Sequence, residues 1–236
     1  MALKAVLFDL DGTLLPMDQE VFVQGYFKLL AEKAASRGYE PEKLYRGIWA
    51  AIKAVVHNDG AKRNEEVFWR AFAGIFGPQV MADKPMFDAF YLNEFQQAKA
   101  CCGFTADAAK TIQLVKAMGL RAILATNPLF PAAATLSRIR WAGMEPEDFE
   151  WVTTYENSSY CKPNPQYYQE ILERTGLKPE ECLMVGNDAV EDTAALAIGI
   201  PVFLLTDCLI NKDNADLAAY PHGSFQALWD YIEKVK

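Results

Sequence analysis

Short apolar runs, rich in β-branched and aromatic residues, recur along this chain of 236 residues. Each run has the length of a strand and is too short for a helix. Because successive positions are apolar, both faces of each strand should be buried, as in a parallel sheet covered by helices. The predicted strands are residues 5–8, 121–126, 149–154, 182–186 and 201–206.

Helical patterns separate the later runs. Residues 105–119 open on a threonine that can cap a helix and close on a glycine, and residues 163–176 have proline near the first turn and glycine at the end. Residues 188–199 form a third helical pattern. Strands alternating with helices form right-handed βαβ units. We therefore predict an α/β fold, with a Rossmann-like parallel sheet flanked by helices.

The chain between the first and second runs has a different character. Residues 17–38, 41–57, 64–77 and 84–100 carry apolar side chains at helical spacing, and none of these segments resembles a strand. We expect about four helices inserted after the first strand. The predicted domains are residues 1–15 together with 101–236, which form the sheet domain, and residues 16–100, which form an all-helical domain.

Composition argues against several classes of protein. The net charge is −8 without a basic cluster, which disfavours nucleic acid as a partner. The sequence has no apolar run of about 18 residues, so we expect no membrane-spanning helix. The amino terminus lacks the layout of a signal peptide, and we expect a cytoplasmic protein. With only two histidines, a zinc site built from histidine is not expected.

Polar side chains follow four of the predicted strands. Because parallel strands present their carboxyl ends at one edge of the sheet, these side chains should meet in one crevice. They are Asp9 and Asp11 after the first strand, Thr126 and Asn127 after the second, Lys162 after the third, and Asn187, Asp188 and Asp192 after the fourth.

These residue types suit phosphoryl transfer. A carboxylate can attack as a nucleophile and form an acyl-phosphate. Mg²⁺ prefers oxygen ligands and keeps several waters, so a few carboxylates suffice to bind it. A hydroxyl, an amide and a lysine would position the phosphoryl group and neutralise its oxygens. The pairing of Asp9 with Asp11, only two positions apart, also indicates that a cation offsets their charge.

The segments "DLDGT", "ATN", "CKPNP" and "GNDAVED" resemble, in order and spacing, the four motifs of the haloacid dehalogenase-like hydrolase superfamily. The helical insert is similar to the α-helical cap, or lid, that many members carry after the first motif. The resemblance implies a Mg²⁺-dependent phosphatase that hydrolyses a small phosphorylated metabolite through an aspartyl-phosphate.

The resemblance also implies a role for each matched residue. Asp9 corresponds to the nucleophile and metal ligand, and Asp11 to the general acid and base, whose backbone carbonyl binds the metal. Thr126 corresponds to the hydroxyl that binds phosphate, with Asn127 assisting it. Lys162 corresponds to the lysine that steadies both the nucleophile and the phosphate.

The fourth motif leaves one choice of alignment open. Many members have Gly-Asp where this chain has Gly-Asn-Asp. Alignment on two acids four positions apart makes Asp188 the metal ligand and Asp192 the second acid, outside the ligand shell with Asn187. Asn187 in the position of the first acid is the alternative, and it would weaken metal binding.

Two other functions remain compatible with the motifs. A phosphomutase of the same fold would return the phosphoryl group instead of releasing it, and a silent binding or regulatory member would have lost activity. A dehalogenase is disfavoured because such members lack the second aspartate, which is present here as Asp11. The sequence predicts neither the substrate nor the oligomeric state.

Overall fold

The computed structural model describes residues 2–236, which contain a six-stranded parallel sheet with strand order β3-β2-β1-β4-β5-β6. The strands are β1 (Ala5–Phe8), β2 (Arg121–Leu124), β3 (Trp151–Val152), β4 (Cys182–Gly186), β5 (Val202–Leu205) and β6 (His222–Gly223). Phe8, the last residue of β1, lies opposite Leu124 of β2 and Val185 of β4. The carboxyl end of β1 therefore lies between the carboxyl ends of β2 and β4.

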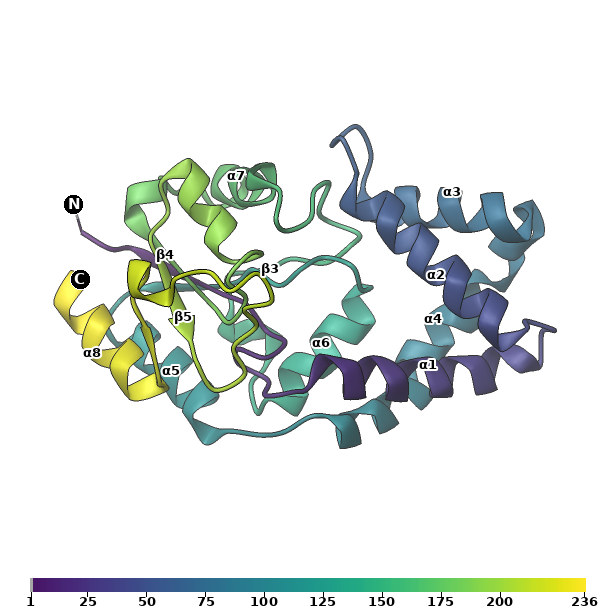
Figure 1. The fold of residues 1–236 in the computed structure, drawn as a ribbon, viewed down its shortest axis with the longest axis horizontal. Coiled ribbons are helices and arrows are strands. Elements are labelled where there is room, and N and C mark those ends of the chain that lie inside the picture. Colours follow the sequence, from purple (N-terminus) through teal and green to yellow (C-terminus); the bar gives the residue numbers. More distant parts are fainter. Residues whose placement is uncertain (1) are drawn as a thin grey trace.

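Helices cover both faces of the sheet (Figure 1). Val6 and Phe8 pack in one apolar cluster with side chains of α5, α6 and α8, whereas Ala5 and Leu7 face a second cluster with α7. This alternation along β1 accounts for its apolar sequence. The helices of the sheet domain are α5 (Ala106–Ala117), α6 (Ala132–Trp141), α7 (Pro165–Thr175) and α8 (Phe225–Val235), with short 3-10 helices η3 (Pro146–Asp148), η4 (Pro179–Glu181), η5 (Thr193–Ile198) and η6 (Leu217–Ala219).

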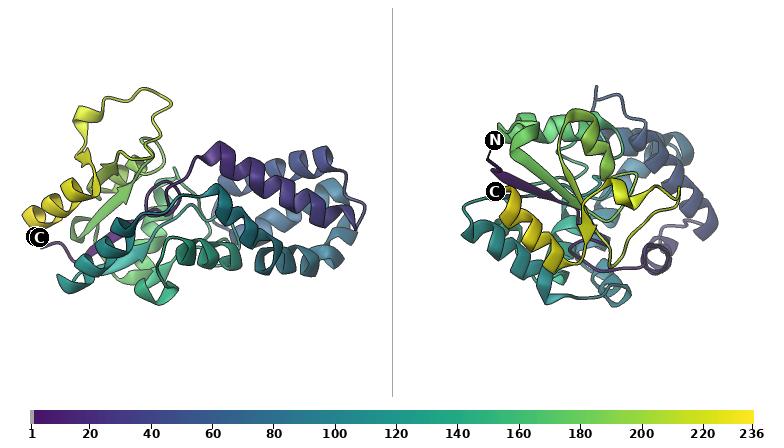
Figure 2. Two further views of the ribbon diagram at one scale, coloured as in Figure 1. Left: turned by 90° about the horizontal axis from the view of Figure 1, so that it is seen from below. Right: turned by 60° about the vertical axis from the view of Figure 1, so that its left-hand side comes forward.

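Residues 19–101 form a helical lobe beyond the carboxyl ends of the strands (Figures 1 and 2). Local signals start its first two helices, because the carboxylates of Asp18 and Glu40 accept hydrogen bonds from the backbone N–H groups that open them. The elements of the lobe are α1 (Gln19–Ala35), α2 (Pro41–Val56), α3 (Asn64–Phe76), η1 (Pro78–Asp83), α4 (Lys84–Leu92) and η2 (Glu94–Cys101).

The two chain connections between lobe and sheet run side by side. The backbone N–H of Gly103 donates to the carbonyl of Pro16 over 2.7 Å, and Met17 pairs with Cys102 in an antiparallel bridge. The chain therefore enters and leaves the lobe at the same place, beside the edge of the sheet.

The start of α3 attaches the lobe at a second place. The backbone N–H groups of Asn64 and Glu65 donate to the carbonyls of Ser158 and Tyr155, both over 2.9 Å. The side chain of Asn64 is fully buried and donates to the Tyr160 carbonyl over 3.2 Å. The helix thus uses carbonyls of the loop after β3 in place of a side-chain cap.

The predicted α/β class and the five predicted strands are confirmed, although β2, β3 and β5 are shorter than predicted. β6, α6 and α8 are additional to the predicted elements. The helix predicted over residues 188–199 is wrong in its first half, where residues 187–192 form a turn and only η5 is helical. None of the helices within residues 2–236 combines the length and apolar character needed to cross a bilayer.

Candidate active site

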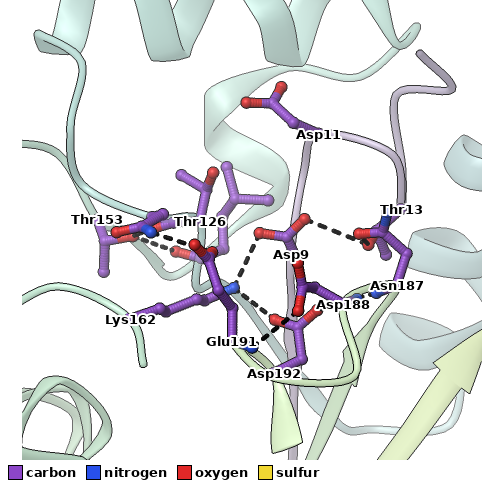
Figure 3. A network of polar contacts seen from close by, with 12 residues as sticks. Asp9, Asp11, Thr13, Thr126, Thr153, Lys162, Asn187, Asp188, Glu191 and Asp192 are labelled. Atoms are coloured by element: carbon purple, nitrogen blue, oxygen red, sulfur yellow. Dashed lines mark hydrogen bonds and ion pairs between the residues drawn. The ribbon is translucent and has the colours of Figure 1, made fainter. Parts of the chain in front are cut away.

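Four polar segments meet at the carboxyl edge of the sheet, as the sequence predicts (Figure 3). Asp9 continues directly from β1, and its backbone N–H donates to the Val185 carbonyl of β4 over 2.9 Å. Thr126 follows β2, and its backbone carbonyl accepts hydrogen bonds from the hydroxyls of Thr153 and Tyr167. The parallel register therefore places residues from distant parts of the chain around Asp9.

Lys162 joins two carboxylates in the interior. Its side chain is fully buried, and its Nζ donates to Asp9 Oδ1 over 2.9 Å and to Asp192 Oδ1 over 2.7 Å. Burial lowers the pKa of Lys162, but Asp192 and Asp9 outweigh this effect and hold the pKa well above its ordinary value. The lysine is therefore a fixed positive charge beside Asp9.

The positive charge near Asp9 does not balance the carboxylates that surround it. Burial raises the pKa of Asp9 to about 7, against the opposing effect of Lys162, and the neighbouring Asp192 and Asp11 raise it further. The single ammonium of Lys162 faces both Asp9 and Asp192. This edge of the sheet consequently holds an excess of negative charge.

A second set of contacts fixes the other oxygen of Asp9. The hydroxyl of Thr13 lies 3.2 Å from Asp9 Oδ2 and 3.0 Å from Asn187 Oδ1, and Asn187 Nδ2 donates to the Cys208 carbonyl over 2.7 Å. Gly12 makes this packing possible, because its φ is +83° and any side chain there would collide with Asn187. Asn187 thus braces the first motif against the fourth.

The fourth motif is organised by its own two carboxylates. Asp192 Oδ2 accepts hydrogen bonds from the backbone N–H groups of Asn187 and Asp188, each over 2.9 Å. Asp188 Oδ1 accepts those of Val190 and Glu191, over 2.7 and 2.9 Å. Asp188 Oδ2 accepts no hydrogen bond from residues 2–236, so one of its oxygens is free to bind a ligand.

Asn127 and Glu191 form the adjoining wall. Asn127 Nδ2 donates to Glu191 Oε2 over 3.0 Å, and the buried Asn127 Oδ1 has no partner within the described chain. Burial raises the pKa of Glu191 to about 7 despite the nearby charge of Lys162. The unsatisfied amide oxygen and the acid together leave hydrogen-bonding capacity for a bound group.

Asp11 takes no part in the network around Asp9 and Lys162. Its carboxylate accepts a hydrogen bond from the guanidinium of Arg138, which is fully buried on α6 and lies 4.4 Å above the Phe130 ring. Asp11 Oδ1 is buried without a partner in the part of the chain described. In this conformation Asp11 is held by α6, a helix that packs against the sheet.

All eight residues singled out in the sequence lie at this edge, but three contributors are not among them. Thr13 stands inside the first motif and is within reach of sequence reasoning. Glu191 lies between the two acids of the fourth motif, where nothing separates it from an ordinary surface acid. Arg138 carries no local signal, since its pairing with Asp11 spans 127 positions.

The donor set fits a hard divalent cation. Asp9 and Asp188 are carboxylates at the ends of adjacent strands, and the excess negative charge here would be offset by a cation. Residues 2–236 contain no group of three histidine, cysteine, aspartate or glutamate side chains arranged around a common metal position. Mg²⁺ accepts such a site, because it binds through one or two carboxylates and retains water.

A cavity of about 280 Å³ opens at this edge and extends into the helical lobe. Asp9, Asp11 and Asp188 line it together with side chains of the helical lobe and of residues 129–131 and 155. A group bound to Asp9 would therefore have its remaining atoms enclosed by the lobe.

Comparison with known proteins places this arrangement in context. A family model described as haloacid dehalogenase-like hydrolase matches residues 3–199. The glyceraldehyde 3-phosphate phosphatase of Methanopyrus kandleri is 26% identical over 192 residues, covering 80% of this chain and 78% of that protein. The glyceraldehyde 3-phosphate phosphatase of Methanocaldococcus jannaschii is 25% identical, and the alignment covers 99% of each chain.

The fold is shared with solved structures. The 2-haloacid dehalogenase of Pseudomonas syringae pv. Tomato superposes with a TM-score of 0.66 over 98% of this chain and 99% of that one, at 19% identity. At such identity the likeness extends to the fold alone.

Proposed function

The chain belongs to the haloacid dehalogenase-like hydrolase family, which confirms the resemblance of its four motifs, and we propose that it is a Mg²⁺-dependent phosphatase of small phosphate esters. The observation that carries the proposal is the buried Lys162, whose ammonium joins Asp9 to Asp192. A carboxylate fixed in this way is oriented for nucleophilic attack. Relatives named as phosphatases support a phosphoric monoester as the substrate.

We assign the first chemical step to Asp9. Its Oδ2 attacks phosphorus, the bond from phosphorus to the ester oxygen breaks, and an aspartyl-phosphate forms. Lys162 and the hydroxyl of Thr126 contact the phosphoryl oxygens, and Asn127 assists. Asp11 gives a proton to the departing alkoxide and then accepts one from the water that hydrolyses the intermediate. For this, the Asp11 side chain must turn from Arg138 toward the reacting oxygen.

The carboxylates of Asp9 and Asp188 and the backbone carbonyl of Asp11 would hold Mg²⁺. When bound, the ion supplies positive charge to the phosphoryl oxygens and offsets the excess negative charge of this edge. Asp192 holds the backbone that presents Asp188, and Asn187 braces the same loop. The proposed roles of these two residues are therefore structural support of the ligand Asp188.

We propose the domain division expected from the sequence, with residues 16–100 as a cap over a core of residues 1–15 and 101–236. A cap over the crevice excludes water from the reacting atoms. The cavity between the lobe and Asp9 supports this division, since atoms from both parts line it.

Phosphate release tests the proposal. The purified protein is incubated with a panel of alkyl and aryl phosphates, with Mg²⁺ or with EDTA, and inorganic phosphate is measured. We expect release with Mg²⁺ and none with EDTA, with recovery when Mg²⁺ is added in excess. A phosphomutase would instead return phosphate to a second hydroxyl. A silent binding protein would release none from any ester.

A further inference from the structure

The cavity beside Asp9 is lined mainly by apolar side chains, many of them aromatic. Eleven aromatic side chains contribute to its wall, most of them from the helical lobe. Trp49 remains 40% exposed, and Phe27, Phe68 and Tyr91 are only partly buried, so these rings present apolar surface to the interior. Removal of such apolar surface from water by a ligand is favourable and contributes to binding.

The charged side chains that line the cavity are all acidic. They are Asp9, Asp11, Asp88, Asp188, Glu191 and Asp192. Within residues 2–236 no lysine, arginine or histidine lines it. The cations beside these acids are engaged: Lys162 with Asp9 and Asp192, Arg138 with Asp11, and Lys84 with Asp88 and Glu65. A second anionic group on the substrate would thus be desolvated among acids without a partner.

The hydroxyl groups and the indole N–H of the aromatic wall contact one another. The hydroxyls of Tyr26 and Tyr91 lie 2.9 Å apart, and Trp69 Nε1 donates to the Tyr155 hydroxyl over 3.4 Å. A substrate rich in hydroxyl groups would lose water without gaining equivalent partners from these side chains. The part of the cavity enclosed by the lobe therefore suits neither sugars nor dicarboxylates.

We propose that the leaving group of the substrate is uncharged and apolar, with a ring or alkyl chain that occupies the aromatic cavity while the phosphate lies at Asp9. This assignment rests on the proposed phosphatase function and adds its substrate class. The proposed substrate differs from glyceraldehyde 3-phosphate, the small and polar ester in the names of two relatives.

Matched esters test the assignment. The leaving groups of ethyl, benzyl and 4-carboxybenzyl phosphate are alkoxides of similar basicity. The three esters therefore differ mainly in the group that enters the cavity. We expect kcat/KM to be roughly 10- to 100-fold higher for benzyl than for ethyl phosphate, as burial of one ring predicts. The added carboxylate should lower kcat/KM at least about 100-fold relative to benzyl phosphate. Glyceraldehyde 3-phosphate and phosphocholine should both fall well below benzyl phosphate.

A charge introduced into the wall provides a second test. Ile52 on α2 lines the cavity, whereas Ile75 on α3 is 39% exposed and lies outside it. Ile52→Lys should raise the ratio of kcat/KM for 4-carboxybenzyl over benzyl phosphate at least about tenfold, because the ammonium partners the carboxylate. Ile75→Lys is the matched control and should leave this ratio unchanged.

The outcomes distinguish the two proposals. Preference for benzyl phosphate, with the ratio shifted only by Ile52→Lys, supports the assignment. Efficient turnover of glyceraldehyde 3-phosphate or 4-carboxybenzyl phosphate by the wild-type protein, at or above that of benzyl phosphate, overturns the apolar leaving group but leaves the phosphatase standing. Preference for phosphocholine also overturns it, in favour of a cationic group. No phosphate release from any ester overturns both.

Discussion

The buried guanidinium of Arg138 donates to the carboxylate of Asp11, so the proposed proton donor is paired with a side chain of α6 and not with Asp9. Partly buried ion pairs couple more strongly than exposed ones, because less solvent screens them. We expect the double-mutant cycle of Arg138→Gln and Asp11→Asn to give a coupling free energy of about 1–3 kcal/mol in urea unfolding.

The same helix offers a control for that cycle. Arg140 and Glu145 form an ion pair whose side chains are 51% and 64% exposed. The cycle of Arg140→Gln and Glu145→Gln should give a coupling free energy of about 0–0.5 kcal/mol. Equal coupling in the two pairs would show that the contact with Arg138 does not hold Asp11.

Substitution of the two first-motif carboxylates should have different kinetic effects. Asp9→Asn should abolish turnover of every ester, because an amide cannot form the phosphoryl intermediate. Asp11→Asn should slow alkyl esters by about 10²–10⁴-fold, since their alkoxides need a proton, and nitrophenyl phosphate much less in the first step. Rapid quench with nitrophenyl phosphate should show a burst of nitrophenol followed by a stall.

The stalled enzyme should carry phosphate on Asp9, which mass spectrometry of a peptic digest can locate. Wild-type enzyme treated in the same way is the control, and it should accumulate little phosphopeptide because its second step retains the base. Equal losses on both kinds of ester, without a burst or a phosphopeptide, would remove Asp11 from the acid and base role.

Magnesium affinity should depend on pH in a specific direction. Burial raises the pKa of Asp9 to about 7 in the metal-free protein, so below pH 7 a proton occupies the carboxylate and must leave before Mg²⁺ binds. The Kd for Mg²⁺, measured by calorimetry, should rise about tenfold for each pH unit below 7 and stay level above it.

Glu191 is the control for this titration, because burial also raises its pKa to about 7 although it is not a proposed ligand. Glu191→Gln should keep the pH dependence of the Kd. A Kd that is constant between pH 5.5 and 8, or a dependence that disappears in Glu191→Gln, would contradict the assignment to Asp9.

A methyl group at Gly186 should disturb the fourth motif. A Cβ at this position would overlap the carboxylate of Asp192, which is buried and holds both Lys162 and the following backbone. Gly186→Ala should lower the free energy of unfolding by about 1–3 kcal/mol and reduce kcat on every ester. Urea unfolding and steady-state kinetics measure the two effects.

Gly74 gives the matched substitution in α3, where a Cβ would meet no atom within 4 Å. Gly74→Ala should raise the free energy of unfolding by about 0.5–1 kcal/mol, as expected for alanine in a helix, without a change in kcat. Similar behaviour of the two variants would show that Asp192 tolerates displacement.

The strand ends were predictable because two local rules agree there: apolar runs specify buried strands, and parallel strands present polar residues at one edge. The turn before η5 was not, because it depends on backbone contacts with a distant segment of the chain, around Ile210. The Asn187 carbonyl, which a continuous helix would pair with the N–H of Glu191, instead accepts the N–H of Ile210, and the N–H of Ala189 donates to the Ile210 carbonyl. Arg138 was not predictable, because its partner is brought close only by the folded sheet.

The attachment of α3 to the loop after β3 has a mechanical consequence. A rigid body held at two separate places retains one rotation, about the line through them, and the paired connections at residues 16–17 and 102–103 are the second such place. The loop residues that receive α3, from Tyr155 to Tyr160, lead within two positions to Lys162. A displacement of the lobe at this attachment would therefore also move the backbone that leads to Lys162, whose ammonium fixes Asp9.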